Sequence, residues 1–163
     1  MIILGIDPGY ATVGYGIIET DGMRFRTVDY GAVTTPANTS FDIRLEMIYD
    51  GICELCGRYK PDAASVEELF FNTNITTGIA VGHSRGVILL ALRKSGVDFY
   101  EYTPLQVKQS VVGYGRAEKK QVMIMTKTLL GLERMPRPDD AADALALAVC
   151  HAHCAKSQLL GLM

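Results

Sequence analysis

The first part of the chain carries three β-strand patterns in direct succession, and this run constrains the fold more than any other feature. Residues 2–7 are apolar and largely β-branched, and Pro8-Gly9 ends them. Residues 13–20 and 24–33 have the composition of two further strands. Asp21-Gly22 between them is a strong hairpin signal, because both residues tolerate positive φ. Three consecutive antiparallel strands are therefore expected to open the domain.

Helical patterns alternate with two more strands in the rest of the chain. Further strands are expected at 63–67 and 97–102. Helices are expected at 41–59 after an N-cap at Ser40, at 76–94, from Pro104 after an N-cap at Thr103, at 118–130 and at 141–153. This order predicts an α/β fold with a mixed five-stranded sheet, three antiparallel strands then two parallel, flanked by helices. It is the order of the ribonuclease-H-like fold.

Length and composition predict a single domain over residues 1–163. The chain is 48% hydrophobic and 21% charged, as in ordinary globular proteins. No apolar run reaches the roughly 18 residues of a membrane span, and the start lacks the pattern of a signal peptide. We therefore expect a cytoplasmic protein with no membrane partner, whose four cysteines are reduced thiols.

Charge is distributed unevenly along the chain, although the net charge is only −2. Residues 1–84 contain 5 Lys and Arg against 11 Asp and Glu, whereas residues 85–137 contain 10 against 4. Such a chain can present a basic surface to phosphate while its total charge stays near zero. Two solvated faces without a partner explain the same numbers, so charge alone does not decide.

Two acidic residues stand at the ends of predicted strands. Asp7 ends the first strand, although an Asp before Pro-Gly is by itself more often a turn former. Glu67 ends the fourth strand beside Glu68. Because side chains alternate along a strand, only one of these two glutamates can face the same way as Asp7.

Two more acids, Asp140 and Asp143, lie three residues apart and share a face of the last predicted helix. Asp139 and Asp140 are explained as N-cap and helix-dipole partners. Asp143 lies among alanines and has no such explanation, which suggests a cation opposite it. Carboxylates are the ligands that magnesium prefers, and two such ions can promote in-line displacement at a phosphodiester.

Five segments of the chain resemble the RuvC family of crossover junction endodeoxyribonucleases at family-like spacing. They are GIDPGYATVGYGII, SVEELFF, FNTNITTGIAVGHSRGVILLA, TPLQVKQSVVGYGRAEKKQV and DDAADALALA, and together they cover nearly the whole chain. The resemblance implies that Asp7, Glu67, Asp140 and Asp143 are the catalytic, metal-binding acids, and that Glu68 and Asp139 are not. It also implies Mg²⁺ as cofactor, two ions per active site, with Mn²⁺ a possible substitute.

The same resemblance implies the substrate and the partners. Members of the family act as homodimers on four-way (Holliday) junction DNA and work with the RuvA–RuvB branch-migration complex. They nick two strands symmetrically, leaving 5′-phosphate and 3′-hydroxyl ends. The predicted helix at residues 76–94 is apolar over much of its surface and not along one face alone. It is therefore expected to be buried against the sheet or a second subunit.

Several residues are candidates for DNA contact. By resemblance, Phe70 matches an aromatic that stacks at the junction, and Lys108 and Lys119 match basic residues near the scissile phosphate. Arg85, Arg116 and Lys120 are further candidate phosphate contacts. Taken singly, each basic residue is more often a solvated helix charge, and an aromatic after a strand is usually core.

Other functions fit parts of the pattern. An ATP-binding domain of the actin and hexokinase kind shares the fold, but it needs two such domains and lacks the Asp140/Asp143 pair. A non-catalytic junction-binding protein would not need the acids, and the residues alone do not exclude a ribonuclease-H-like enzyme acting on RNA. The Cys and His residues at 53–56 and 150–154 lie within predicted helices, which disfavours a zinc site.

Overall fold

The computed structural model describes residues 1–68 and 75–159. Its strands are β1 (Ile2–Asp7), β2 (Thr12–Thr20), β3 (Phe25–Thr34), β4 (Ala63–Glu67) and β5 (Phe99–Tyr102). They form a sheet in the order β3-β2-β1-β4-β5. The first three strands pair antiparallel, and β4 pairs parallel with both β1 and β5. The predicted mixed sheet is therefore confirmed.

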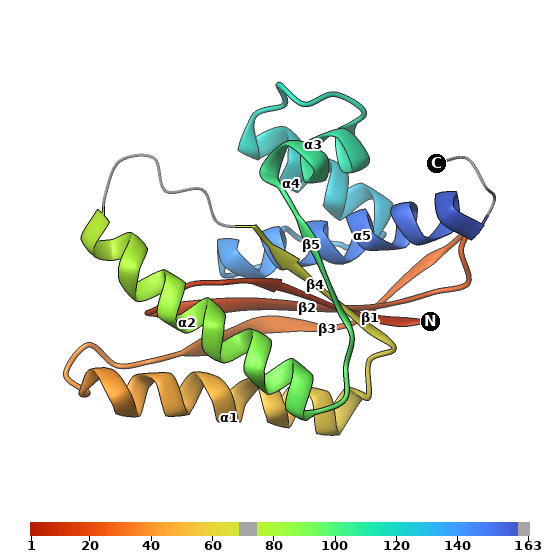
Figure 1. Cartoon of the computed structure of the whole chain (residues 1–163). Helices are drawn as coiled ribbons and strands as arrows, with labels where there is room; N and C mark the ends of the chain where they lie inside the picture. The colour runs from red at the N-terminus through yellow and green to blue at the C-terminus, as the bar shows by residue number, and fades with distance from the viewer. Residues whose placement is uncertain (69–74, 160–163) are drawn as a thin grey trace.

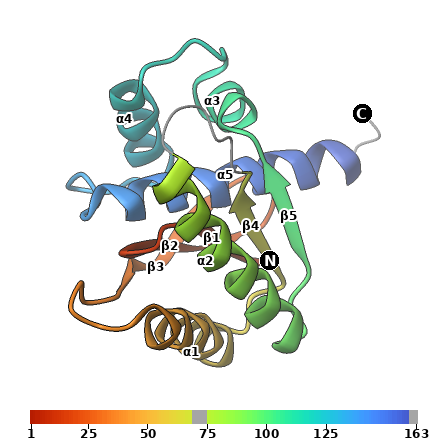
Figure 2. The same cartoon turned by 60° about the vertical axis from the view of Figure 1, so that its left-hand side comes forward.

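Helices cover both faces of this sheet (Figures 1 and 2). One face carries α1 (Phe41–Tyr59) and α2 (Ile75–Lys94), which pack against each other. The other face carries α5 (Asp139–Leu159), and α3 (Pro104–Val112) and α4 (Lys119–Leu129) pack on α5. In the described ranges, no helix combines the length and the apolar character that crossing a membrane requires.

The alternation of side chains along the strands divides the core in two. Ile3 and Ile18 are fully buried on the side of α5, together with Leu145. Their strand neighbours Leu4 and Ile17 are buried on the opposite side, against α1 and α2. Successive strand residues point to opposite faces, so the central strands are apolar on both.

Glycines in the central strands allow α5 to lie directly on the sheet. A methyl group at Gly5 would overlap the carbonyl oxygen of Ala144, and one at Gly14 would overlap that of Asp140. A hydrogen bond of 2.8 Å from Ser65 Oγ to the carbonyl oxygen of Leu147 joins β4 to the same helix. The first turn of α5 is thereby fixed beside the ends of the central strands.

The hairpin of β2 and β3 differs from expectation in the length of its turn. Four residues, Asp21 to Arg24, separate β2 from β3. The Asp21 carboxylate accepts the backbone N–H groups of Met23 and Arg24, both at 2.8 Å. Only Gly22 in this turn has a positive φ, of 89°. The side-chain acceptor stabilises this turn, which is one residue longer than the expected strand bounds of 13–20 and 24–33 leave.

Some element ends also differ from expectation. Thr103 and Pro104 begin α3 with the predicted cap, whereas the Ser40 side chain at the N-cap of α1 makes no capping hydrogen bond. The fifth strand begins at Phe99, two residues late, because the Val97 N–H still donates to the last turn of α2. The last helix continues past residue 153 to Leu159, since no Gly or Pro interrupts it there.

We expect Gly14→Ala to lower the free energy of unfolding by about 1–3 kcal/mol, because the added methyl must displace the first turn of α5. Gly57→Ala is the matched control, since Gly57 lies in α1 with open space around it. That substitution should stabilise the protein by about 0.5–1 kcal/mol. Urea unfolding measures the free energy of unfolding of both variants. If Gly14→Ala leaves that free energy unchanged, the close contact between Gly14 and the first turn of α5 is contradicted.

Candidate active site

The ends of β1 and β4 bring Asp7 and Glu67 side by side. Ile6 of β1 pairs with Val66 of β4 in a parallel ladder, and the two acids are the next residues of each strand. Gly5, two residues before Asp7, lies against α5. Asp7 therefore faces that helix.

The same alternation separates the two neighbouring glutamates of β4. The Ser65 side chain binds α5, so Glu67, two residues further along, faces α5 as well. Glu68 points to the other face and is exposed. The structure therefore places Glu67, and not Glu68, on the side of Asp7.

Helix α5 adds the other two acids at this end of the sheet, on the left in Figure 1. Asp140 lies in the first turn of α5, and its backbone rests on Gly14, the register partner of Asp7. Asp143 lies one turn further on, between the buried Ala142 and Ala144. Acids from three distant segments thus meet at one end of the sheet.

Burial and mutual repulsion disfavour the charged forms of these acids. Burial raises the pKa of Asp7 to about 8, and the carboxylates of Glu67, Asp143 and Asp140 contribute to that rise. Burial and the charge of Asp143 also raise the pKa of Glu67. Burial raises the pKa of Asp143 too. In the metal-free protein, ionising these acids together is therefore unfavourable.

Lys119, the first residue of α4, supplies one positive charge to this group. Its Nζ donates to Asp143 Oδ2 at 2.7 Å, which raises the pKa of Lys119. The same ammonium acts to lower the pKa values of Asp7 and Glu67. Within the described residues, the Lys119 ammonium is thus the cation that lies against Asp143.

A cavity of about 300 Å³ opens between α3, α4 and α5 beside the acids. Its lining consists of Glu67, Pro104, Val107, Lys108, Lys119, Val122, Asp143, Ala146 and Leu147. Two of the predicted acids and the two best candidate phosphate contacts, Lys108 and Lys119, therefore share one space. A phosphate group in this cavity would lie close to both charge types.

The donor chemistry of the site fits a divalent cation. The four acids offer oxygen ligands only, which Mg²⁺ and Mn²⁺ accept, and the raised pKa of Asp7 reflects first its burial and then the neighbouring carboxylates. Among the described residues, however, no three His, Cys, Asp or Glu side chains stand in position to hold one metal ion.

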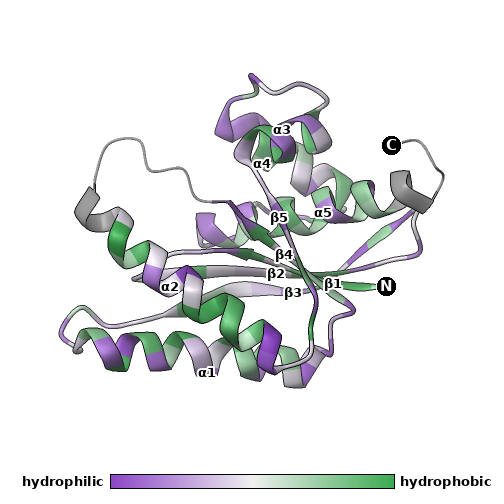
Figure 3. Ribbon diagram, in the orientation of Figure 1, coloured by the Kyte–Doolittle hydropathy of each residue, from purple (hydrophilic) through white to green (hydrophobic). Residues whose placement is uncertain are grey.

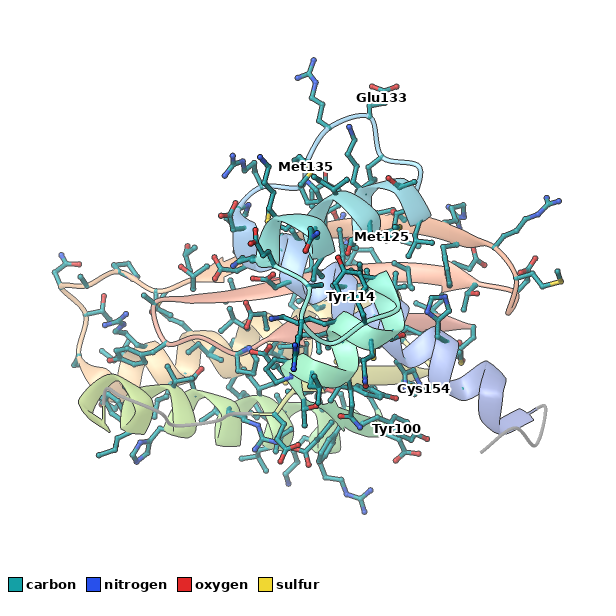
Figure 4. The ribbon with its side chains drawn as sticks, turned by 90° about the horizontal axis from the view of Figure 1, so that it is seen from above. Tyr100, Tyr114, Met125, Glu133, Met135 and Cys154 are labelled. Carbon is teal, nitrogen blue, oxygen red and sulfur yellow. The ribbon has the colours of Figure 1, made fainter. Side chains whose placement is uncertain are left out.

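The other predicted DNA contacts lie in different settings. Arg116 and Lys120 are exposed, in and just after the loop between α3 and α4 that also contains Tyr114, labelled in Figure 4. The Arg85 guanidinium forms an ion pair with Glu101. Phe70 lies outside the described residues. None of these observations tests a contact with DNA.

Among the Cys and His residues of α5, His151 has clear partners within the protein. His151 Nδ1 shares a hydrogen bond of 2.8 Å with the Tyr102 hydroxyl, and the Tyr100 ring lies 4.4 Å from the His151 ring, centroid to centroid. Cys154, labelled with Tyr100 in Figure 4, is a free thiol, as is Cys150. These contacts give His151 a place in the core.

Comparison with known proteins identifies the family. The family model described as crossover junction endodeoxyribonuclease RuvC matches residues 3–151. The chain belongs to the RuvC family. Crossover junction endodeoxyribonuclease RuvC of Ruminiclostridium cellulolyticum is 58% identical over 151 residues, which cover 93% of this chain and 91% of that protein. The RuvC of Alkaliphilus metalliredigens is 58% identical over 160 residues, 98% of each chain.

Solved RuvC structures have the same fold. The structure of T. thermophilus RuvC in complex with Holliday junction substrate matches with a TM-score of 0.92 at 36% identity. The match covers 97% of this chain and 96% of that one. It confirms the predicted ribonuclease-H-like α/β architecture.

Sequence reasoning missed Ser84 on α2. This residue is fully buried, and its Oγ donates to the Gly9 carbonyl oxygen at 2.5 Å, two residues after Asp7. It stands in a helix of mainly apolar residues, where a small polar side chain does not indicate which backbone it will reach. The sequence also gave no sign that Arg85 would pair with Glu101.

The raised pKa of Asp7 predicts a pH-dependent cost to stability. A folded-state pKa of about 8, above the ordinary value of 3.8, means that the metal-free protein loses stability as pH rises between about 4 and 8. Asp7→Asn removes the charge, so its advantage over the wild type should grow across that window. At pH 8 we expect it to be at least about 1.4 kcal/mol, the equivalent of one pKa unit.

Urea unfolding in EDTA at pH 5 and pH 8 measures this effect. Glu68→Gln is the control, because Glu68 is exposed and should change stability little at either pH. An Asp7→Asn protein less stable than the wild type at pH 8 would show that Asp7 is not under electrostatic strain.

Proposed function

We propose that this chain is a structure-selective DNA endonuclease that resolves four-way (Holliday) junctions by paired symmetric nicks, leaving 5′-phosphate and 3′-hydroxyl ends. The observation that carries the proposal is the group of acids at one end of the sheet, beside a cavity with two lysines, in a member of the RuvC family. The nuclease domain would span residues 1–163.

In this proposal Asp7, Glu67, Asp140 and Asp143 are the catalytic acids and hold two Mg²⁺ ions, for which Mn²⁺ can substitute. Bound magnesium would supply Lewis-acid stabilisation of the charge that develops on the phosphodiester. The all-oxygen donor set and the raised pKa values of Asp7, Glu67 and Asp143 support a divalent cation here. The close packing of α5 on the sheet would keep the acids near one another despite their repulsion.

Basic residues would bring the DNA backbone to the acids. Lys108 and Lys119 line the same cavity as Glu67 and Asp143, so a phosphate attracted by the lysines would lie next to the acids. Arg116 and Lys120 are exposed nearby along the chain and would contact further phosphates, which positions DNA without reading its sequence. Stacking of Phe70 on a base at the junction rests on the family resemblance alone.

We propose that the working form is a homodimer, since paired nicks need two active sites. An apolar groove of about 720 Å³ runs along α2 and is lined by Leu45, Gly78, Ile79, Gly82, His83, Gly86, Val87 and Leu90. Ile79 and Leu90 are 57% and 51% exposed, and Figure 3 shows strongly apolar stretches on this outer helix. A second copy of the chain would bury this face. The RuvA–RuvB complex is a further partner proposed by family resemblance.

Asp7→Asn should abolish cleavage of a synthetic four-way junction in Mg²⁺ while junction binding survives, because it removes a metal ligand and no phosphate contact. Cleavage should fall by more than about 100-fold, because a direct metal ligand is lost, whereas loss of a residue that only supports a ligand costs about 10–100-fold. Gel assays of nicking and of binding on the same substrate measure the two properties separately. Glu68→Gln, the adjacent exposed acid, should cleave like the wild type.

The same assay tests the activity itself when linear duplex and RNA are run beside the junction. We expect Mg²⁺-dependent symmetric nicks in the junction and little cleavage of the other substrates. Normal turnover by Asp7→Asn would refute the site. Equal cleavage of linear duplex or RNA would refute junction selectivity.

Leu90→Asp should convert the dimer to a monomer at micromolar concentration, because it places a charge in the apolar groove of α2. Ile124→Asp is the control, since Ile124 is similarly exposed, at 49%, but lies on α4. Sedimentation or light scattering measures the mass of each variant. A monomeric wild type, or a Leu90→Asp dimer, would place the interface elsewhere.

A further inference from the structure

Two neighbouring residues of α2 reach the backbone beside two of the proposed metal-binding acids. The fully buried Ser84 hydroxyl donates to the Gly9 carbonyl oxygen at 2.5 Å, two residues after Asp7. Arg85 Nε donates to the carbonyl oxygen of Glu67 itself, at 3.4 Å. One turn of one helix thus contacts both strand ends that carry an acid.

The two acids are the last residues of their strands, Asp7 in β1 and Glu67 in β4. Glu67 is the last residue of β4, and beyond it the Glu68 N–H makes one further backbone hydrogen bond, to Tyr102. After Asp7, the chain enters a turn that contains Gly9. The carbonyl oxygen of Gly9 accepts the buried Ser84 hydroxyl, and removal of the Ser84 side chain would leave that oxygen without this partner. The direction of each acid therefore depends on what holds the backbone next to it.

The setting of Arg85 argues against a direct contact with phosphate. Its guanidinium forms an ion pair with Glu101 of β5, and its side chain is only 21% exposed. A phosphate approaching this arginine would meet the Glu101 carboxylate beside it. Arg85 instead joins three elements, because its helix, the end of β4 and the adjacent β5 all meet at this one side chain.

We infer that Ser84 and Arg85 are positioning residues, which hold the ends of β1 and β4 so that Asp7 and Glu67 can bind a divalent cation together. Glu101 contributes to the same positioning, because its ion pair holds the Arg85 guanidinium in place. This inference rests on the proposed function, since it assigns a purpose to the approach of the two acids. It replaces the phosphate contact expected for Arg85.

The test uses two measurements on variants of the full-length chain, Ser84→Ala, Arg85→Ala and Glu101→Gln. Calorimetry without DNA gives the Mg²⁺ affinity of each variant. A separate assay with junction DNA gives the Mg²⁺ concentration for half-maximal cleavage. We expect about a 10-fold or larger increase in that concentration for each variant, with the rate restored by excess Mg²⁺. Arg93→Ala is the matched control, an exposed arginine in the last turn of α2 that should leave both values unchanged.

Two further variants separate positioning from other roles of Arg85. Arg85→Ala and Glu101→Gln break the same contact. The double variant should therefore need no more Mg²⁺ for half-maximal cleavage than whichever single variant binds Mg²⁺ more weakly. Arg85→Lys should recover part of the Mg²⁺ affinity by keeping the ion pair. A phosphate contact predicts instead that Arg85→Ala lowers the salt dependence of junction binding by about one ion, and that Glu101→Gln leaves Mg²⁺ affinity unchanged.

The outcomes also separate this inference from the proposed function. If the wild type and Arg93→Ala show no Mg²⁺-dependent junction cleavage, the proposed function fails. If both cleave while Ser84→Ala, Arg85→Ala and Glu101→Gln keep the wild-type Mg²⁺ affinity, the positioning role fails and the nuclease stands. Glu101→Gln decides the matter if a change at the buried Ser84 prevents folding, because the Glu101 side chain is 42% exposed.

Discussion

The direct contact between α5 and the glycines of the central strands is the constraint on which the rest of the site depends. Because Gly5 and Gly14 lack side chains, the backbone of the helix rests on the sheet at Ala144 and Asp140. That contact sets Asp140 and Asp143 beside the strand ends and keeps them there. Apolar burial on both faces of the sheet supplies the free energy that holds several carboxylates together against their repulsion.

Electrostatic strain at this end of the sheet is only partly relieved within the chain. Lys119 pairs with Asp143, yet Asp7 still has a pKa of about 8. Under the proposed function, a divalent cation and the Lys119 ammonium would compete for the same carboxylate. An arrangement that costs stability without a ligand and gains it with one is typical of a binding site and unusual for a structural ion pair.

Much of the fold followed from the sequence because its signals were local. The strand periodicity, the Thr103 cap and the three-residue spacing of Asp140 and Asp143 each depend on a few neighbouring residues. The choice between Glu67 and Glu68 was different. Alternation along β4 required that only one face Asp7, and the Ser65 contact with α5 shows that it is Glu67.

The remaining features depend on how distant segments meet. The close approach of α5 could not be read from Gly5 and Gly14, since a strand glycine equally marks a bulge or a bend. Arg85 was predicted as a candidate phosphate contact from its charge, and the sequence did not show its ion pair with Glu101, sixteen residues away on another element. Phe70 remains a prediction from resemblance.

One turn of helix α2 lies between the proposed dimer interface and the proposed metal site. His83 lines the outer apolar groove, while the next two residues, Ser84 and Arg85, reach inward to the strand ends. A helix turn moves as a unit, because its backbone hydrogen bonds fix neighbouring residues relative to one another. A second subunit seated on the outer face would therefore restrain the same turn that holds the acids. Dimer formation and the geometry of the metal site would then depend on one short segment of the chain.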